Sequence, residues 1–484
     1  MATTALLLLL AGVAVMAATG WPNHAVLFGV ACAIATIGVA TGHIDPALLQ
    51  ALPARVVGIL EHDLLQAIAL YAFVAALLRH VDVAARIADA VEAWLRALRV
   101  PAGPRGALAG YAVGLLAAPL NGSVGAGVNM LAATAAPRWR LHGLPAPRAL
   151  AFTAATATLG VLVPPSLVLI LLGDAMMRAH TEGLQLGGIT GVRVINTQDL
   201  IQACVPPAFM LATAWAGVVG WRARGPAVAA ARARVTRTRA TWTGVLAPCL
   251  VVLMLVAIAV GWLRAVEAAA TAALALFVFA LAGGQLGQGR LAAVLDDAMA
   301  TTGALFALLL AATTLSLMLR AAGCDRLAAD ALAGFAGRPA AATAAVLGVL
   351  LVLAFALDAF ELIFLVVPIV MPPLLALGVD AAWVACLALI VLQIGFLLPP
   401  WGYALVLARG FAGDAATSAR SIAREAAPFV AVLVVLLALV QARPEITHWL
   451  RSAPDMLPAA APTGSTDDLL REMSRPRDAA GSPP

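Results

Sequence analysis

The sequence predicts an all-α polytopic membrane protein with two inverted repeats, each holding a re-entrant hairpin and a transmembrane helix broken by two prolines. Of the 484 residues, 63% are hydrophobic and 11% are charged, which leaves too little polar surface for a water-soluble domain. Apolar runs that could cross a bilayer recur along the chain. Two of them are interrupted by Pro164-Pro165 and Pro399-Pro400, and a broken backbone at membrane depth commonly forms a transport site.

The two interruptions belong to an internal repeat. A shift of 235 positions aligns five glycine or proline pairs: Pro137 with Pro372, Gly143 with Gly378, Gly160 with Gly395, Pro164 with Pro399, and Pro165 with Pro400. These pairs fall within 29 aligned positions, so the agreement is concentrated around the breaks. We therefore expect two similarly built halves, an arrangement that is typical of secondary transporters.

The first half, residues 1–221, is expected to combine complete spans with an amphipathic helix, a hairpin, a broken helix and an exposed insertion. Arginines and acids alternate with apolar residues over 81–100, which is the pattern of an amphipathic helix lying along the interface. The next two apolar runs are each too short to cross, so 105–136 is expected to form a re-entrant hairpin. The broken helix occupies 146–173, and the more polar residues 174–198 are expected to form an exposed insertion. Complete spans are predicted at 4–20, 24–41, 63–78 and about 199–221.

The arginines orient these elements in the membrane. All 30 basic residues are arginines, and they are densest in 222–241, which the positive-inside rule assigns to the cytoplasmic side. Counting crossings backwards places 81–100 and the loop at 138–148, both rich in arginine, on the same side. An odd number of crossings separates the halves, so the second half is inverted. Its loop at 376–382 then faces the outside and contains no arginine, in agreement with the rule.

The second half, residues 242–441, repeats this plan. It is expected to hold an interfacial helix at 322–338, a hairpin at 340–373 and a broken helix at 381–409. The tail, 442–484, is rich in proline, alanine, serine and charged residues and is expected to be disordered. Complete spans are predicted near 242–264, 267–284, 300–319 and 425–441.

The first hairpin and the first break supply one set of candidate ligands. The tip, Asn121-Gly122-Ser123-Val124-Gly125, would bring backbone carbonyls and two side-chain oxygens to mid-membrane, unless it is an ordinary loop between full spans. Ser166 opens a half-helix whose free N–H groups could hold a carboxylate, or it only caps that helix. Na⁺ is expected at Asn121, Ser123 and Thr158. The other candidates flank the break: Thr156, which like Thr158 could instead bond its own helix, Gly160, Pro164 and Pro165.

The second hairpin places two acids, Asp358 and Glu361, inside an apolar run. Intramembrane carboxylates are costly, so they indicate ion ligands or protonatable groups, and the alternative is a structural salt bridge to an arginine. Gln393 and Gly395 precede the second break at Pro399-Pro400 and could contribute an amide and a close backbone approach.

Several classes of function are disfavoured by motifs that the sequence lacks. It contains no Walker A lysine motif, no GxSxG, no HExxH and no cluster of haem or zinc ligands, which argues against an ATP-driven pump and a familiar hydrolase. The five cysteines form no CxxC pair, and no basic surface interleaved with aromatic residues suggests nucleic-acid binding. We therefore expect a transporter without a bound cofactor rather than an enzyme.

Two stretches also resemble the large membrane subunit (DctM type) of tripartite ATP-independent periplasmic (TRAP) transporters. Residues 158–174, TLGVLVPPSLVLILLGD, look like the family's TLGxLIPPS signature, and their ending resembles the mannitol/chloroaromatic branch. The similarity covers nearly the whole chain apart from the tail. In the second half it runs through LDAFE at 357–361, Pro368, GVD at 378–380, Trp383 and QIGFLLPPWG at 393–402.

The resemblance implies an elevator-type transporter of the ion-transporter superfamily in the bacterial inner membrane, which imports a small organic acid and is usually driven by sodium. It also implies two partners, a periplasmic solute-binding protein and a small four-span membrane subunit. The chain has too few leading spans to include the small subunit as a fusion. It departs from the family pattern at Leu398, at Trp401 and at the first hairpin tip, and the first two departures affect the second cation site.

Three alternatives stay open on the sequence. Proton coupling through Asp358 or Glu361 would replace sodium coupling, and undiminished uptake without sodium at constant pH would reveal it. A membrane-embedded enzyme using the same acids would lose a chemical product, rather than solute accumulation, in an Asp358→Ala protein. A purely structural subunit would tolerate alanine at Asn121 and Ser123 without loss of uptake.

Overall fold

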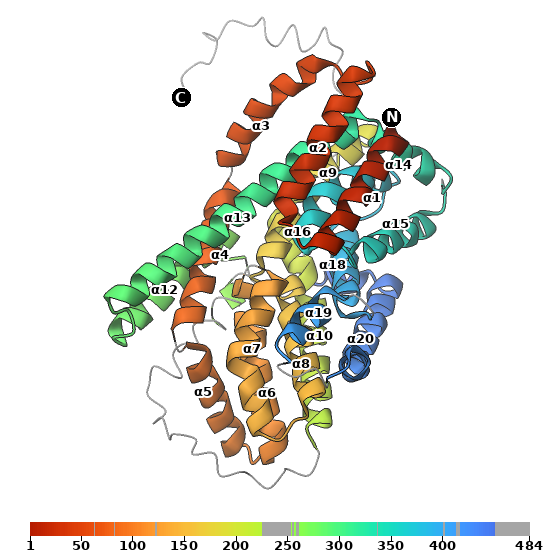
Figure 1. The fold of residues 1–484 in the computed structure, drawn as a ribbon. Coiled ribbons are helices and arrows are strands. Elements are labelled where there is room, and N and C mark those ends of the chain that lie inside the picture. The colour runs from red at the N-terminus through yellow and green to blue at the C-terminus, as the bar shows by residue number, and fades with distance from the viewer. Residues whose placement is uncertain are drawn as a thin grey trace, which may run out of the picture.

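The computed structural model is helical in all the regular structure that it describes (Figure 1). Five of the described helices, with the first broken helix taken as one, are long and apolar enough to cross a membrane. Most of the span expected at 242–264, most of the basic linker and most of the tail lie outside the described residues. The structure describes residues 1–61, 63–81, 83–121, 123–224, 253, 256–257, 261–335, 337–399, 402–412 and 417–450.

One group of helices, here called the scaffold, is built around the long helix α13 (Gln288–Ala321). α13 packs against α2 (Asn23–Ala40) and α4 (Asp63–His80), and it runs obliquely across the view in Figure 1. It begins well before the predicted span at 300–319, because no proline interrupts the preceding residues. The scaffold also contains α1 (Ala2–Thr19), η1 (Pro46–Gln50), α3 (Ala51–Leu60) and α12 (Ala265–Ala282).

Two helical hairpins occupy the stretches where the sequence predicts them. In the first, α6 (Ala102–Ala117) and α7 (Val124–Leu141) flank a short turn, η2 (Pro119–Asn121). In the second, α15 (Pro339–Leu353) ends five residues before a new helix begins with a capping box. That arm consists of α16 (Ala359–Glu361), a π-helical turn (Leu362–Val366) and α17 (Val367–Leu375).

The broken helices lie at the centre of the molecule and interlock the two halves. α8 (Ala146–Leu162) and α18 (Ala381–Leu397) are buried along nearly their whole length. Each packs against the hairpin of its own half, α8 against α7 and α18 against α15. After the breaks, α9 (Leu167–Leu186) packs against α17, and α19 (Tyr403–Gly410) packs against α7. The restarted helix of each half therefore contacts the hairpin of the other.

The prediction of an exposed insertion from residue 174 is wrong for its first half, because α9 continues to Leu186. The buried positions Met176, Ala179 and Gly183 recur at helical spacing and form an apolar face. That face meets α17 so closely that a Cβ on Gly183 would lie 2.8 Å from Cβ of Leu375. Only the segment between α9 and α10 (Thr197–Arg222) is a loop.

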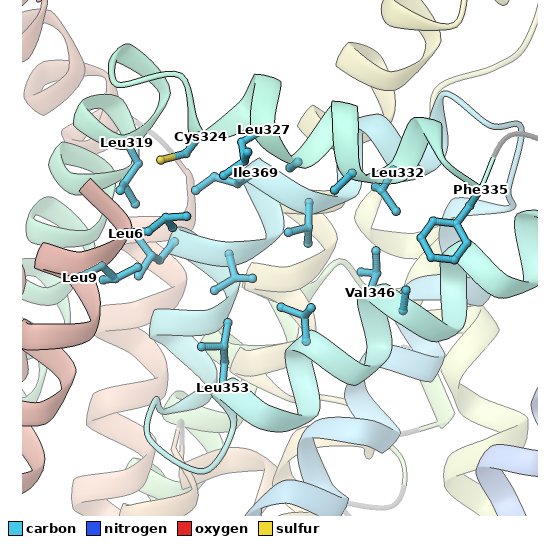
Figure 2. A pocket seen from close by; sticks show the side chains of 17 residues that line it. Leu6, Leu9, Leu319, Cys324, Leu327, Leu332, Phe335, Val346, Leu353 and Ile369 are labelled. Carbon is cyan, nitrogen blue, oxygen red and sulfur yellow. The ribbon is translucent and has the colours of Figure 1, made fainter. Parts of the chain in front are cut away.

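The two amphipathic helices cover the hairpins. α5 (Val83–Ala97) packs on α6, and α14 (Cys324–Ala333) packs on α17 and α1. Beneath α14 lies a cavity of about 340 Å³, here called the α14 cavity, between α1 and the second hairpin (Figure 2). Its lining is hydrocarbon except for the sulfur of Cys324, as Figure 2 shows for Leu6, Val346 and Ile369.

A chain of aromatic rings ties the last helices to the first hairpin. α10, α20 (Ala419–Ala442) and the short α21 (Glu445–His448) pack beside the broken helices. Trp139, Phe152, Phe429 and Trp215 stack edge to face in that order, with neighbouring ring centroids 5.6, 5.5 and 5.4 Å apart. Each such pair contributes about 0.5–1.5 kcal/mol beyond the burial of its area. The chain connects α7, α8, α20 and α10.

Candidate ion and substrate site

Both hairpin tips carry an oxygen-bearing residue at the same repeat position. Ser123 and Asp358 are 235 positions apart, and each caps the helix that forms the second arm of its hairpin. The Ser123 hydroxyl accepts a hydrogen bond of 3.1 Å from the amide of Ala126, and the Asp358 carboxylate accepts one of 2.7 Å from the amide of Ala359. Each cap satisfies a free N–H at the tip and leaves further lone pairs available.

Glu361 is completely buried at the second tip, and its partners are polar rather than basic. Its Oε2 accepts a hydrogen bond of 3.0 Å from the amide of Asp358, and its Oε1 accepts one from the side-chain amide of Asn23. No ion pair to Asp358 or Glu361 occurs within the described part of the chain. The arginine salt bridge considered from the sequence is therefore not found there, and the contact with Asn23 ties the hairpin tip to scaffold helix α2.

Tyr403 brings the second broken helix to the first hairpin tip. A Cβ on Gly125 would lie 3.1 Å from the Tyr403 hydroxyl, so the glycine leaves room for the phenol at the tip. Tyr403 of α19 therefore lies against Gly125 of α7 and joins the second broken helix to the first hairpin tip.

At the first break, most of the polar groups are bonded locally. Thr158 donates a hydrogen bond of 2.8 Å to the carbonyl of Ala155 in its own helix. The Ser166 hydroxyl donates to the carbonyl of Gly160 and accepts from the amide of Leu169 at 3.3 Å, so the structure favours its capping role. Pro164 and Pro165 are buried between these groups.

Glycine allows each broken helix to approach its own hairpin. A Cβ on Gly160 would lie 2.7 Å from the carbonyl oxygen of Ala118, at the end of α6. A Cβ on Gly395 would lie 2.6 Å from Cβ of Ala354, at the end of α15. The repeat pair Gly160 and Gly395 therefore performs the same packing role in both halves.

Two buried polar side chains near the breaks have no partner. Thr156 and Gln393 are fully buried, and neither the Thr156 hydroxyl nor either end of the Gln393 amide makes a hydrogen bond to the described residues. An unsatisfied buried amide or hydroxyl costs about 1–3 kcal/mol, and such groups are rare unless they have a functional reason. These two side chains are the strongest indication that a polar ligand binds beside the breaks.

The donor set is compatible with Na⁺ at the first tip. Hard cations prefer oxygen ligands, and a hydroxyl that donates its hydrogen elsewhere, as Thr158 does, keeps its lone pairs for a cation. Ser123 lies at the tip, and Asn121 lies in η2 immediately before it. Gly122, Pro400 and Trp401 lie outside the described residues, while Pro399 is the last described residue before the second break.

Asn23 and Tyr403 were not predicted as site residues. Asn23 follows Pro22 between two apolar runs and looks like an ordinary loop residue. Tyr403 is one of only three tyrosines in the chain and lies directly after the second break, and that position is the one signal that could have identified it. Contacts between distant halves bring both residues to the site.

Comparison with known proteins agrees with this architecture. The model of the family described as the DctM component of the tripartite ATP-independent periplasmic transporter matches residues 10–446. The fold is similar to the crystal structure of the YdaH transporter from Alcanivorax borkumensis, with a TM-score of 0.59 and 16% sequence identity, covering 84% of this chain and 89% of that one. No curated protein sequence matches the chain. Because the family model covers most of its length, the chain belongs to the DctM family of TRAP transporter large membrane subunits.

Proposed function

We propose that this subunit imports a small organic acid in symport with Na⁺, and that solute and ion bind where the two hairpin tips meet the broken helices. The unpartnered hydroxyl of Thr156 and amide of Gln393 carry this proposal, because buried polar atoms beside both breaks need a ligand to be satisfied. Asn121, Ser123 and Thr158 would supply oxygens to Na⁺, and the tip acids Asp358 and Glu361 would complete the second half of the site.

An elevator motion is the transport mechanism that the packing supports best. The hairpins and broken helices contact one another closely, whereas α1 and α14 meet the second hairpin through hydrocarbon side chains, partly across the α14 cavity. Apolar contact is non-directional and opposes sliding less than a network of hydrogen bonds would. In this proposal, neutralisation of the site by bound ion and solute allows the hairpins and broken helices to move as one body along the scaffold.

Membership of the family also supports two partners, a periplasmic solute-binding protein that delivers the solute and a small four-span membrane subunit. A cell that expresses all three proteins is therefore the appropriate test system. Growth of a deletion strain on a panel of organic acids would first identify a transported solute.

The experiment that tests sodium coupling is uptake of that solute with sodium replaced by choline at constant pH. We expect uptake to fall to background without sodium, and uptake that is unchanged would refute sodium coupling. Proton coupling through the tip acids is the second candidate, because Asp358 and Glu361 have no ion-pair partner among the described residues. It predicts that Asp358→Asn and Glu361→Gln abolish uptake while Thr158→Val preserves it.

A further inference from the structure

A second cavity, with a volume of about 430 Å³, lies between scaffold helices α3 and α13 on one side and α9 and α17, which belong to a broken helix and a hairpin, on the other. α9 and α13 line it with their C-terminal parts, and α3 lines it with Arg55, Gly58 and Ile59. Its polar lining consists of Arg55, Arg178, Arg320, Asp174, Glu182 and Ser316. We call it the arginine cavity.

Positive charge is in excess in this cavity. Arg178 pairs with Asp174 at 2.7 Å, and Arg320 pairs with Glu182 at 2.7 Å. The third guanidinium, that of Arg55, forms no hydrogen bond or ion pair with any residue in the described ranges. Three arginines against two carboxylates leave one positive charge for a ligand, and guanidinium binds carboxylate well because its donors match the two oxygens.

The rest of the lining fits a short organic body attached to that carboxylate. Ser316 is 6% exposed, and its hydroxyl makes no hydrogen bond within the described part of the chain, so it can bond to a ligand. Ile59, Leu309 and Phe364 form an apolar wall. Small-molecule sites commonly combine such a wall with a few convergent polar groups.

The arginine cavity lies close to the second hairpin tip. A smaller cavity shares Leu309 and Phe364 with it and is further lined by Leu171 and Phe360. Phe360 directly precedes Glu361 at the second hairpin tip. This void holds only about 10 Å³ and is lined by hydrocarbon, so it shows that the arginine cavity adjoins the second tip, and passage of a solute between them requires these side chains to move.

We propose that the arginine cavity is an anion-binding antechamber, which takes the carboxylate of an organic acid on Arg55 before the solute reaches the hairpin tips. This inference rests on the proposed function, since it assigns an initial binding site to the same class of solute. Arg320 connects the arginine cavity to the proposed elevator motion. It pairs with Glu182 of α9 and also donates a hydrogen bond of 2.6 Å to the carbonyl of Pro368 in α17.

The test is direct binding to the purified full chain in lipid nanodiscs, followed by fluorine NMR. The probe is ω-trifluoropentanoate, and its uncharged amide is the matched ligand control. We expect the carboxylate to bind, the amide not to bind, and Arg55→Gln to weaken carboxylate binding about tenfold, the scale of a lost charge-assisted contact. Arg55→Lys should recover part of the affinity because it keeps the charge. Arg326→Gln, an exposed arginine on α14 outside the cavity, should bind as the wild type does.

Measurements on an Asp358→Asn protein separate this inference from the proposed function. If the antechamber is correct, this variant loses solute uptake in cells but still binds the probe with Arg55-dependent affinity. Equal binding by wild type and Arg55→Gln, or equal losses in Arg55→Gln and Arg326→Gln, would overturn the antechamber and leave the hairpin site untouched. Arg55-dependent binding together with sodium-independent uptake would contradict sodium coupling alone.

Discussion

At the scale of single residues, the site is defined by polar groups that the fold leaves without partners and by glycines that allow close approach. The hydroxyls of Thr158 and Ser166 are bonded to backbone groups of the first broken helix, whereas Thr156 and Gln393 have no partner among the described residues. A buried side chain that serves only packing would normally be apolar or fully bonded. Replacing an unpartnered polar side chain with an apolar one should therefore raise the stability of the protein and lower its solute uptake.

Replacing Gln393 with leucine tests this opposition. Leucine has a similar size and removes two unsatisfied polar atoms, so the free energy of unfolding should rise by about 1–3 kcal/mol while solute uptake is lost. Thermal unfolding in detergent and uptake in cells measure the two quantities. Thr343→Val is the matched control, because the buried Thr343 hydroxyl is bonded to the carbonyl of Pro339 and lies away from the breaks. A less stable Gln393→Leu protein with normal uptake would assign Gln393 a structural role.

Gly160→Ala tests the contact between the broken helix and its hairpin. The new Cβ would lie 2.7 Å from a backbone oxygen that cannot easily move, so we expect a loss of about 1–3 kcal/mol in stability and reduced uptake. Gly348→Ala in α15 is the control, since its Cβ would meet nothing within 4 Å. There, alanine should be neutral or stabilise the helix by up to about 1 kcal/mol. Equal effects of the two substitutions on the unfolding temperature would contradict the packing role of Gly160.

At the scale of elements, one acidic side chain holds three helices together on the side of the molecule that carries Arg222. Glu425 of α20 accepts hydrogen bonds from Arg148 of α8, at 2.9 and 3.2 Å, and also pairs with Arg222 of α10. The Arg148 guanidinium additionally donates to the carbonyl of Arg222 at 2.9 Å. These partly buried groups join the ends of helices that are also connected through the aromatic chain.

Glu425→Gln should destabilise the protein, because it leaves two neighbouring guanidiniums without a counter-charge. The side chains are about one-fifth to one-quarter exposed, so solvent screens part of the loss and we expect about 1–2 kcal/mol. Denaturation monitored by tryptophan fluorescence would measure this change. Glu445→Gln is the control, because the Glu445 side chain is 82% exposed and its carboxylate lies 3.9 Å from the Arg443 guanidinium, a long and solvent-screened ion pair. Unchanged stability of Glu425→Gln would show that the cluster contributes nothing to holding α8, α10 and α20 together.

At the scale of the whole molecule, the interlocked hairpins and broken helices form one unit, and the scaffold forms another. The contacts between them include apolar surfaces at the α14 cavity and a few polar links, from Asn23 to Glu361 and from Arg320 to Glu182. If the interlocked unit slides, these links must break during each cycle.

Cross-linking tests this motion directly. In a background without the five native cysteines, Glu182→Cys with Arg320→Cys places a thiol on each side of the boundary. A short bifunctional thiol reagent should abolish uptake reversibly, because it fixes α9 to α13. Gly127→Cys with Ala157→Cys joins two positions inside the moving unit, where the glycine Cβ would lie 3.4 Å from Cβ of Ala157. Its cross-linked and reduced forms should transport equally, and full uptake by the cross-linked Glu182–Arg320 pair would rule out the elevator motion.

The sequence alone predicted the local helical elements and the repeat that relates the two halves. Apolar run length, amphipathic spacing and the proline breaks predicted the hairpins and broken helices within a few residues, because each of these signals acts over one or two helical turns. The exposed insertion was predicted wrongly because polar residues such as Arg178 and Glu182 hide the apolar face that packs on α17. In this segment the polar residues dominate the composition, and the burial of the apolar face becomes evident only when α17 is placed against it.

By itself, the sequence determined that the chain spans a membrane, that it contains two related halves and that both are broken at paired prolines. The length of an apolar run indicates a membrane span, and each proline removes a backbone N–H donor at its own position, so both properties can be read from the residues alone. Only the tertiary structure decided which groups share a site: Asn23 with Glu361, Tyr403 with Gly125, and Arg55 with Arg178 and Arg320. Such contacts join residues far apart in the chain, and packing between helices, rather than any local pattern, brings them together.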